Sequence, residues 1–134
     1  MAVVNKRTLV DSGTRHVVMF EVNNDTNDAV QVVDASALVG HVSNPTLDIR
    51  SIKWNTTAAT SDLAFEFDAG TDSHGISVHG SGEYGYHGKQ PNITNPEATG
   101  VTGDIVITNA SALTGTFILE VTKSKGYTAS GQTR

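Results

Sequence analysis

The stretch GDIVITNASALTGTFILEVTKSK, residues 103–125, contains two arms in which apolar residues alternate with their neighbours. Alternation at every second position, in residue types that favour pleated surfaces, indicates β-strands. The small polar residues between the arms are typical of a loop, so this stretch predicts a β-hairpin. The alternating apolar residues are Ile105, Ile107, Phe117, Leu119 and Val121.

The rest of the chain repeats this construction, and no window shows a convincing helical stripe. Further strands are predicted at residues 3–10, 15–22, 29–34, 47–54, 63–67 and 76–78. The Asn- and Asp-rich residues 23–28 predict a turn, because these side chains bond their own main chain and tolerate left-handed backbone. About eight short strands with closely spaced turns predict one all-β domain over residues 1–134, an antiparallel β-sandwich or jelly-roll-like fold.

Two strands carry additional information. The strand at residues 15–22 has apolar residues on both faces, with Val17 and Met19 opposite Val18 and Phe20. Such a strand is either covered on both sides or has one side in an interface. In the strand at residues 47–54, the apolar residues change parity at its middle, which predicts a β-bulge near Arg50-Ser51 that returns all of them to one side.

Composition excludes several classes of protein. The 134 residues suffice for one core, and without cysteine there are no disulfides or thiolate metal sites. The formal net charge is −5 and the nine Lys and Arg residues are scattered, so we expect no direct nucleic-acid binding. No apolar stretch approaches membrane-spanning length, and the N-terminus lacks the pattern of a signal peptide, so we expect neither a membrane anchor nor standard secretion.

A glycine-rich stretch at residues 80–103 interrupts the strands. We expect it to form one long loop, and loops of this length in compact domains are usually functional or interfacial. Tyr84, Tyr86 and His87 give this loop side chains suited to contacts. At the two ends of the chain we expect an extended N-terminal segment, about residues 1–12, and a polar C-terminal tail, about residues 126–134.

Candidate chemistry is sparse. His74, His79 and His87 lie close in sequence with Asp68, Asp72 and Glu83 among them, a donor set that could bind a divalent metal. No His-x-His pair supplies two ligands from one strand, so we expect these histidines to form local hydrogen bonds and no metal to be bound. No G-x-S-x-G elbow or other nucleophile motif is present. We therefore expect no enzyme and no cofactor.

The order of segments resembles the small β-rich virion structural proteins of tailed bacteriophages. The segments that carry the resemblance are residues 17–22, 32–38, 47–57, 63–68, 102–108 and 115–125, and the resemblance covers about residues 15–125. The resemblance implies a non-enzymatic virion component, with a capsid decoration (cement) protein as first choice. Such a protein binds and stabilises the shell of the major capsid protein as a homo-oligomer, for which the family suggests a trimer. It would be made in the host cytoplasm and located on the capsid surface.

Two alternatives stay open. One is a neck or tail adaptor, or a fibre-associated module, of the same particle. The other is a lectin-like domain that stacks sugar rings on Trp54, Tyr84 and Tyr86, although a core tryptophan and interface tyrosines explain these residues more simply. The residues predicted to contact partners are Lys6, Arg7, Tyr84, Tyr86, His87, Lys89, Gln90 and Asn92.

Overall fold

The computed structural model is all-β and describes residues 3–57, 62–85, 90–97 and 99–128. Its seven strands form one antiparallel sheet with the strand order β1-β2-β7-β3-β6, to which β4 pairs through β7 and β5 through β4. The strands are β1 (Val3–Asp11), β2 (Arg15–Val33), β3 (His41–Thr56), β4 (Leu63–Phe67), β5 (Ser73–Val78), β6 (Ser81–Tyr84) and β7 (Ile105–Tyr127). A single 3-10 turn at Ala35–Ala37 follows β2, and no helix in the described part is long and apolar enough to cross a membrane.

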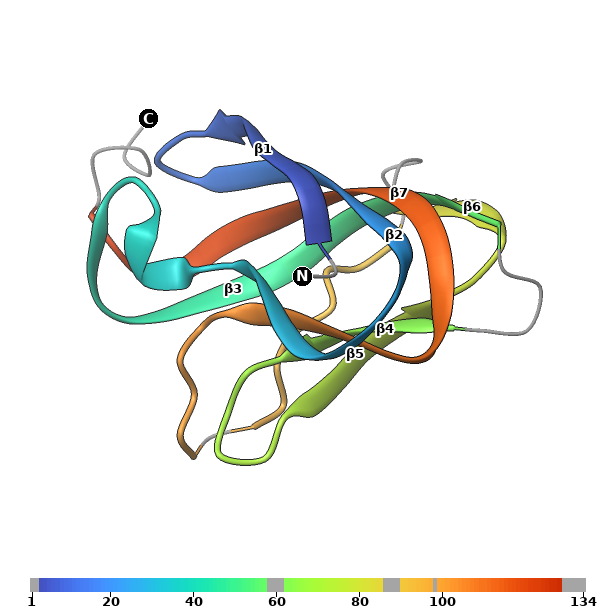
Figure 1. The fold of residues 1–134 in the computed structure, drawn as a ribbon. Helices are drawn as coiled ribbons and strands as arrows, with labels where there is room; N and C mark the ends of the chain where they lie inside the picture. The colour runs from blue at the N-terminus through green and yellow to red at the C-terminus, as the bar shows by residue number, and fades with distance from the viewer. Residues whose placement is uncertain (1–2, 58–61, 86–89, 98, 129–134) are drawn as a thin grey trace.

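The two longest strands bend and pass through both layers of a sandwich-like fold (Figure 1). β2 has 19 residues and β7 has 23, and they pair along nearly their whole length. The first half of β2 and the second half of β7 lie in one layer with β1, β3 and β6. The other halves lie in the second layer with β4 and β5. We call the first of these the five-strand layer and the second the short layer.

Three phenylalanines join the two layers at the centre of the core. Phe20 of β2 and Phe117 of β7 stack with ring centroids 5.2 Å apart in the five-strand layer. Phe65 of β4 meets them edge-on from the short layer at 6.1 and 6.0 Å. All three are fully buried. Offset and edge-to-face contacts of this kind add stability beyond the area that they bury.

The predicted hairpin at residues 103–125 is wrong, because both of its arms belong to the single strand β7 (Ile105–Tyr127), which bends instead of turning back. Both halves of β7 pair with β2, whose own predicted turn at residues 23–28 is a bend as well. Asn27 pairs with Asn109 at this point, and the register shifts on both sides of Asn27. Asn24 adopts a positive φ of 50°, which asparagine tolerates, so polar residues serve here as β-bulges within continuous strands.

The β-bulge predicted near Arg50-Ser51 is confirmed by a register shift between Ile49 and Ser51 in the pairing of β3 with β7. Leu47, Ile49 and Ile52 are all buried. Trp54 is partly buried and packs against the same core. The extra residue thus keeps the apolar side chains of β3 on one side of the strand.

Part of the predicted glycine-rich loop is also ordered as sheet. β6 lies within it and pairs with residues 52–55 of β3, and Ile93 forms an isolated bridge to Ile49. The stretch therefore covers the edge of β3, where a single long loop was expected. At the ends of the chain, the N-terminal segment is the edge strand β1, and β7 continues to the buried Tyr127, whose hydroxyl donates to the Ala35 carbonyl at 2.8 Å.

Candidate interaction surfaces

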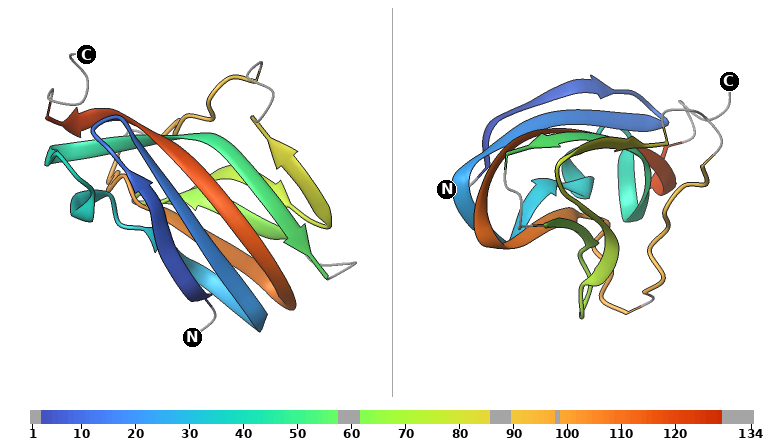
Figure 2. Two further views of the ribbon diagram at one scale, coloured as in Figure 1. Left: turned by 90° about the horizontal axis from the view of Figure 1, so that it is seen from above. Right: turned by 90° about the vertical axis from the view of Figure 1, so that its right-hand side faces the viewer.

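The outer face of the five-strand layer is exposed to solvent and displays β1, β2, β7, β3 and β6 side by side (Figure 2, left). Side chains alternate across the sheet, and Phe20, Phe117 and Leu119 are buried on the inner side, so their neighbours point outward. We call this surface the outer face. Its residues include Arg7, Val10, Arg15, Val17, Met19, Glu21, Asp48, Lys53, Asn55, Ser81, Glu83, Thr116, Ile118, Glu120 and Thr122.

The centre of the outer face is apolar. Val17, Met19 and Ile118 are partly exposed, and Met19 and Ile118 are direct cross-strand partners. The sequence left open whether the second apolar side of β2 is covered or belongs to an interface. Within the described chain, this side of β2 lies at the surface. Around it lie charged groups, including Arg15, whose Nη1 is 3.1 Å from Glu120 Oε2. An apolar centre with a polar rim is the usual anatomy of a protein interface.

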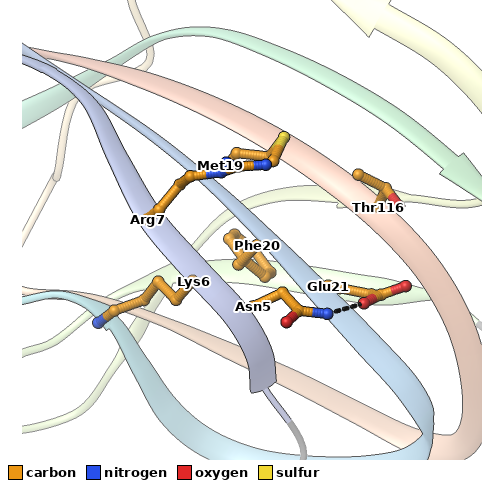
Figure 3. Close-up of a pocket in the computed structure, with 7 residues that line it drawn as sticks. All are labelled: Asn5, Lys6, Arg7, Met19, Phe20, Glu21 and Thr116. Atoms are coloured by element: carbon orange, nitrogen blue, oxygen red, sulfur yellow. Dashed lines mark hydrogen bonds between the residues drawn. The ribbon is translucent and has the colours of Figure 1, made fainter.

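A hollow of about 470 Å³ lies beside the outer face where β1 bulges (Figure 3). Val4 pairs with Glu21 and Arg7 with Met19, so Asn5 and Lys6 face a single residue of β2. Asn5 has a φ of 51°, and its Nδ2 donates to Glu21 Oε1 at 2.5 Å. The bulge in β1 is therefore fixed to β2 by a hydrogen bond between side chains. The hollow is lined by Asn5, Lys6, Arg7, Met19, Phe20, Glu21 and Thr116.

The two N-terminal residues predicted as contacts, Lys6 and Arg7, do not share a surface. In Figure 3 the Arg7 side chain lies along Met19, whereas the Lys6 side chain points away from it. The Lys6 ammonium reaches the Val32 carbonyl oxygen at 3.5 Å. Alternation along β1 separates the two cations, so only Arg7 belongs to the outer face.

A second candidate surface lies at the end of the sandwich where the β1–β2 turn, the 3-10 turn and the start of β3 meet (Figure 1). Leu9, Val39 and Val42 are the exposed large hydrophobic residues in the described part of the chain, with 47%, 53% and 61% of their surface accessible. Asp11 Oδ2 accepts a hydrogen bond from the Val39 amide at 3.0 Å, which holds two of these segments together. We call Leu9, Val39 and Val42 the aliphatic end.

A buried cluster around Lys123 lies next to the aliphatic end and holds its segments together. The Lys123 side chain is 0% exposed, and its ammonium lies 2.6 Å from Asp11 Oδ1. The same ammonium donates to the carbonyl oxygens of Ser12 and Val39. One buried cation thus ties β7 to the β1–β2 turn and to the segment before β3. Losing one member of such a pair is costly, because the other charge stays buried.

His16 lies next to this cluster and is only 4% exposed. Its Nδ1 is 3.8 Å from Asp11 Oδ1, beyond hydrogen-bond distance, and has no hydrogen-bond partner among the described residues. Burial lowers the pKa of His16 below its ordinary value; the Asp11 carboxylate opposes this shift, and the Lys123 and Lys6 ammonium groups add to it. Burial therefore favours the neutral form of the imidazole.

Two of the six predicted contact residues of the glycine-rich stretch, Tyr84 and Asn92, bond within the molecule. The Tyr84 hydroxyl donates to the Pro91 carbonyl at 2.7 Å. Asn92 accepts from Arg50 at 3.5 Å and donates to Thr122 at 3.4 Å. These bonds hold the stretch along β3. Gln90 is partly buried, and Tyr86, His87 and Lys89 lie outside the described residues.

The candidate metal site is not assembled among the described residues, and the candidate sugar site is described only in part, because Tyr86 lies outside them. No group of three or more histidine, cysteine, aspartate or glutamate residues that could hold a metal ion occurs there, and His87 lies outside it. Trp54 donates its indole N–H to the His79 carbonyl at 3.0 Å. A Cβ atom added at Gly82 would lie 2.7 Å from the Trp54 ring, so the ring packs against that strand. Trp54 is thus used in packing.

Sequence reasoning missed the aliphatic end and Lys123. For Lys123 a signal existed, because it continues the inward parity of Phe117, Leu119 and Val121 along β7. A lysine at an inward position predicts a buried charge that needs a partner. For Leu9, Val39 and Val42 no local signal exists, since their exposure depends on which segments cover one another.

Comparison of the chain with protein-family models, with curated proteins and with solved structures finds no match. A functional assignment therefore depends on the fold, its two candidate surfaces and the order of its segments.

Proposed function

We propose that this chain is a non-enzymatic structural protein of a tailed-phage virion, most like a capsid decoration protein that binds and stabilises the major capsid shell. The resemblance in segment order supports the class of protein. The observation that carries the docking role is the aliphatic end, where Leu9, Val39 and Val42 are largely exposed. These side chains lie on segments that the Asp11–Val39 hydrogen bond joins, and exposed aliphatic side chains on adjoining segments suit a protein–protein contact.

The buried cluster makes this end suitable for tight docking. Lys123 and Asp11 fix the backbones of the segments that carry Leu9 and Val39. A surface that is ordered before binding loses little conformational entropy on association, so more of the contact energy appears as affinity. A cement protein that joins neighbouring shell subunits needs such a rigid contact.

The first experiment measures where the protein is and how many copies an intact particle contains. A decoration protein is expected on the shell in a copy number comparable to that of the major capsid protein. A neck or tail adaptor would instead be present in the few copies that form one ring per particle, and it would co-purify with tails or portal parts. Quantitative mass spectrometry of purified particles, with immunogold labelling, distinguishes the two positions.

The second experiment tests the surface. We expect the purified protein to co-sediment with capsid shells of its phage and to raise their heat resistance. Val42→Glu should abolish this binding because it places a charge in the apolar contact. Ser77→Glu, which adds the same charge at an exposed position of β5, is the matched control and should bind normally.

The lectin alternative makes the opposite demand. It requires saturable binding to a sugar array that is lost in a Tyr84→Ala, Tyr86→Ala double variant. Glycan binding of this kind, combined with no binding to capsids, would overturn the proposed function.

A further inference from the structure

We infer that the outer face is a two-fold interface between two copies of this chain, with the symmetry axis running along β7. This inference goes beyond the capsid role and does not depend on it, because it uses a different surface from the aliphatic end. Its basis is the strand order, the cross-strand register and the distribution of charge on the outer face.

The strand order of the layer is symmetric about β7. In β1-β2-β7-β3-β6, two strands lie on each side of β7, so β1 and β6 are each about 10 Å from it. The proposed axis is parallel to β7 and lies just above the outer face. Rotation by 180° about it places a second copy face to face with the first, with β1 opposite β6 and β2 opposite β3. In a two-fold interface the same patch of both copies meets, so a residue i that contacts residue j of the second copy is matched by j contacting i.

The register then gives the facing pairs. One row across the sheet runs through five direct partners: Arg7, Met19, Ile118, Lys53 and Glu83. With Ile118 on the axis, Arg7 of one copy faces Glu83 of the other, so opposite charges meet at both ends of the row. Met19 faces Lys53, whose aliphatic stem can cover it.

The neighbouring rows fit the same rotation. Glu21, Thr116 and Asn55 form the next row, so Glu21 of one copy faces the Asn55 amide of the other. Glu120 lies on the axis and faces its own counterpart. Its carboxylate already bonds Arg15 at 3.1 Å and the Ser51 hydroxyl at 3.3 Å, which offsets the repulsion between the two copies.

The charge of the outer face selects a second copy as its occupant. The chain carries a formal net charge of −5, so two copies repel each other on average. The outer face, however, has Arg7, Arg15 and Lys53 against Glu21, Asp48, Glu83 and Glu120, a balance of only −1. Two such faces therefore repel each other much less than two average surfaces of this chain, and they meet around the apolar centre formed by Val17, Met19 and Ile118.

The test uses the full chain in sedimentation equilibrium over a range of concentrations. We expect a monomer–dimer equilibrium for the unaltered chain. Arg7→Glu and Glu83→Arg should each weaken the dimer by about tenfold or more, because like charges then face each other, and the double variant should regain most of the affinity. Ser77→Glu lies on the short layer and should leave the dimer unchanged. Unchanged denaturation midpoints show that the variants stay folded.

A second measurement places the axis. The chain has no cysteine, so Ile118→Cys introduces a unique thiol, and the proposed dimer brings two of these thiols face to face. Packed sheets lie about 10 Å apart, which is too far for a disulfide, so a short bis-maleimide is the suitable cross-linker. Ile118→Cys should give a covalent dimer at concentrations at which Ser77→Cys stays monomeric.

Each contrary result has a definite meaning. A monomer at all concentrations, a trimer, or a dimer that is insensitive to both charge reversals would overturn the inference. Failure of the double variant to recover affinity would also overturn it, since Arg7 and Glu83 would then not face each other. Val42→Glu should leave the dimer intact, so failure of the capsid proposal and failure of the dimer are separable.

Discussion

The side-chain amide of Asn27 donates a hydrogen bond to the side-chain oxygen of Asn109 across 2.5 Å, at the point where β2 and β7 bend together. The Asn109 amide nitrogen in turn donates to the backbone carbonyls of Asp25 and Ser111 at 3.0 and 2.9 Å. Both asparagines are buried, with exposures of 4% and 2%. The bends interrupt the regular ladder, and this pair supplies hydrogen bonds that the ladder cannot provide.

Asn109→Ala should therefore destabilise the fold by about 2–3 kcal/mol, because it leaves the buried Asn27 amide and two backbone carbonyls without their partner. Asn23→Ala, at an exposed position of the same bend, is the matched control and should cost less than about 0.5 kcal/mol. Urea denaturation monitored by circular dichroism measures both values. Equal midpoints for the two variants would show that the buried bonds contribute nothing.

These bends also show what the sequence can and cannot predict about the fold. The alternation correctly indicated an all-β chain, but it divided β2 and β7 into two strands each and missed β6. The parity change in residues 47–54 correctly located the bulge in β3. The Asn-rich segments predict hairpin turns where the chain forms bulges, because a turn and a bulge need the same left-handed tolerance and the same local hydrogen bonds. What separates them is the pairing between Asn27 and Asn109, which are 82 residues apart, and no local pattern contains it.

The residues of the candidate surfaces could also be predicted from the sequence only in part. The second apolar side of β2, with Val17 and Met19, was readable from alternation alone. Arg7 was predicted as a contact residue from its charge near the N-terminus; the structure places it on the outer face, and its contact with a partner stays a prediction. Tyr84 was predicted as a contact from its side chain, but its hydroxyl is bonded within the molecule. Its partner, the Pro91 carbonyl, belongs to a fold-back of the chain that composition cannot reveal.

Lys123→Met should lower the free energy of unfolding by about 3–5 kcal/mol, because the Asp11 carboxylate then stays largely buried without its cation. The backbone carbonyls of Ser12 and Val39 lose their donor as well. Adding Asp11→Asn to Lys123→Met should recover part of this loss by removing the unpaired charge. A double-mutant cycle from denaturation curves gives the coupling, and purely additive losses would contradict the ion pair's role.

The stability of the protein should fall as the pH drops below 6.5, with His16 as one cause. Burial lowers the pKa of the folded His16 below 6.5, so the unfolded chain takes up its proton first. The contribution is fully present above pH 6.5 and is lost as the pH falls from there toward the folded pKa. His16→Gln, which cannot be protonated, should show a flatter profile in urea denaturation across pH 7 to 5. Parallel profiles for both proteins would rule out His16 as the source.

Tyr127 should produce the opposite dependence at high pH. Burial, with the nearby Asp11, Asp104 and Asp34 carboxylates, raises its pKa to about 12. The unfolded chain loses this proton near pH 10, so the contribution is complete below pH 10 and disappears as the pH rises toward 12. Absorbance titration of the folded protein should show one late-ionising tyrosine that is missing in Tyr127→Phe. A titration without that late step would contradict the burial of this hydroxyl.

Alanine substitutions at Gly85 and Gly80 test how closely the glycine-rich stretch must pack against β3. Both have a positive φ, 86° and 71°, so alanine is strained at each by about 1–2 kcal/mol. At Gly80 the added Cβ would meet nothing within 4 Å, whereas at Gly85 it would overlap the Arg50 carbonyl oxygen. Gly80→Ala should thus cost only the backbone strain, and Gly85→Ala should cost clearly more and loosen β6 from β3. Hydrogen exchange at the β3–β6 amides together with urea denaturation measures both effects, and equal losses in the two variants would show that this close approach is not required.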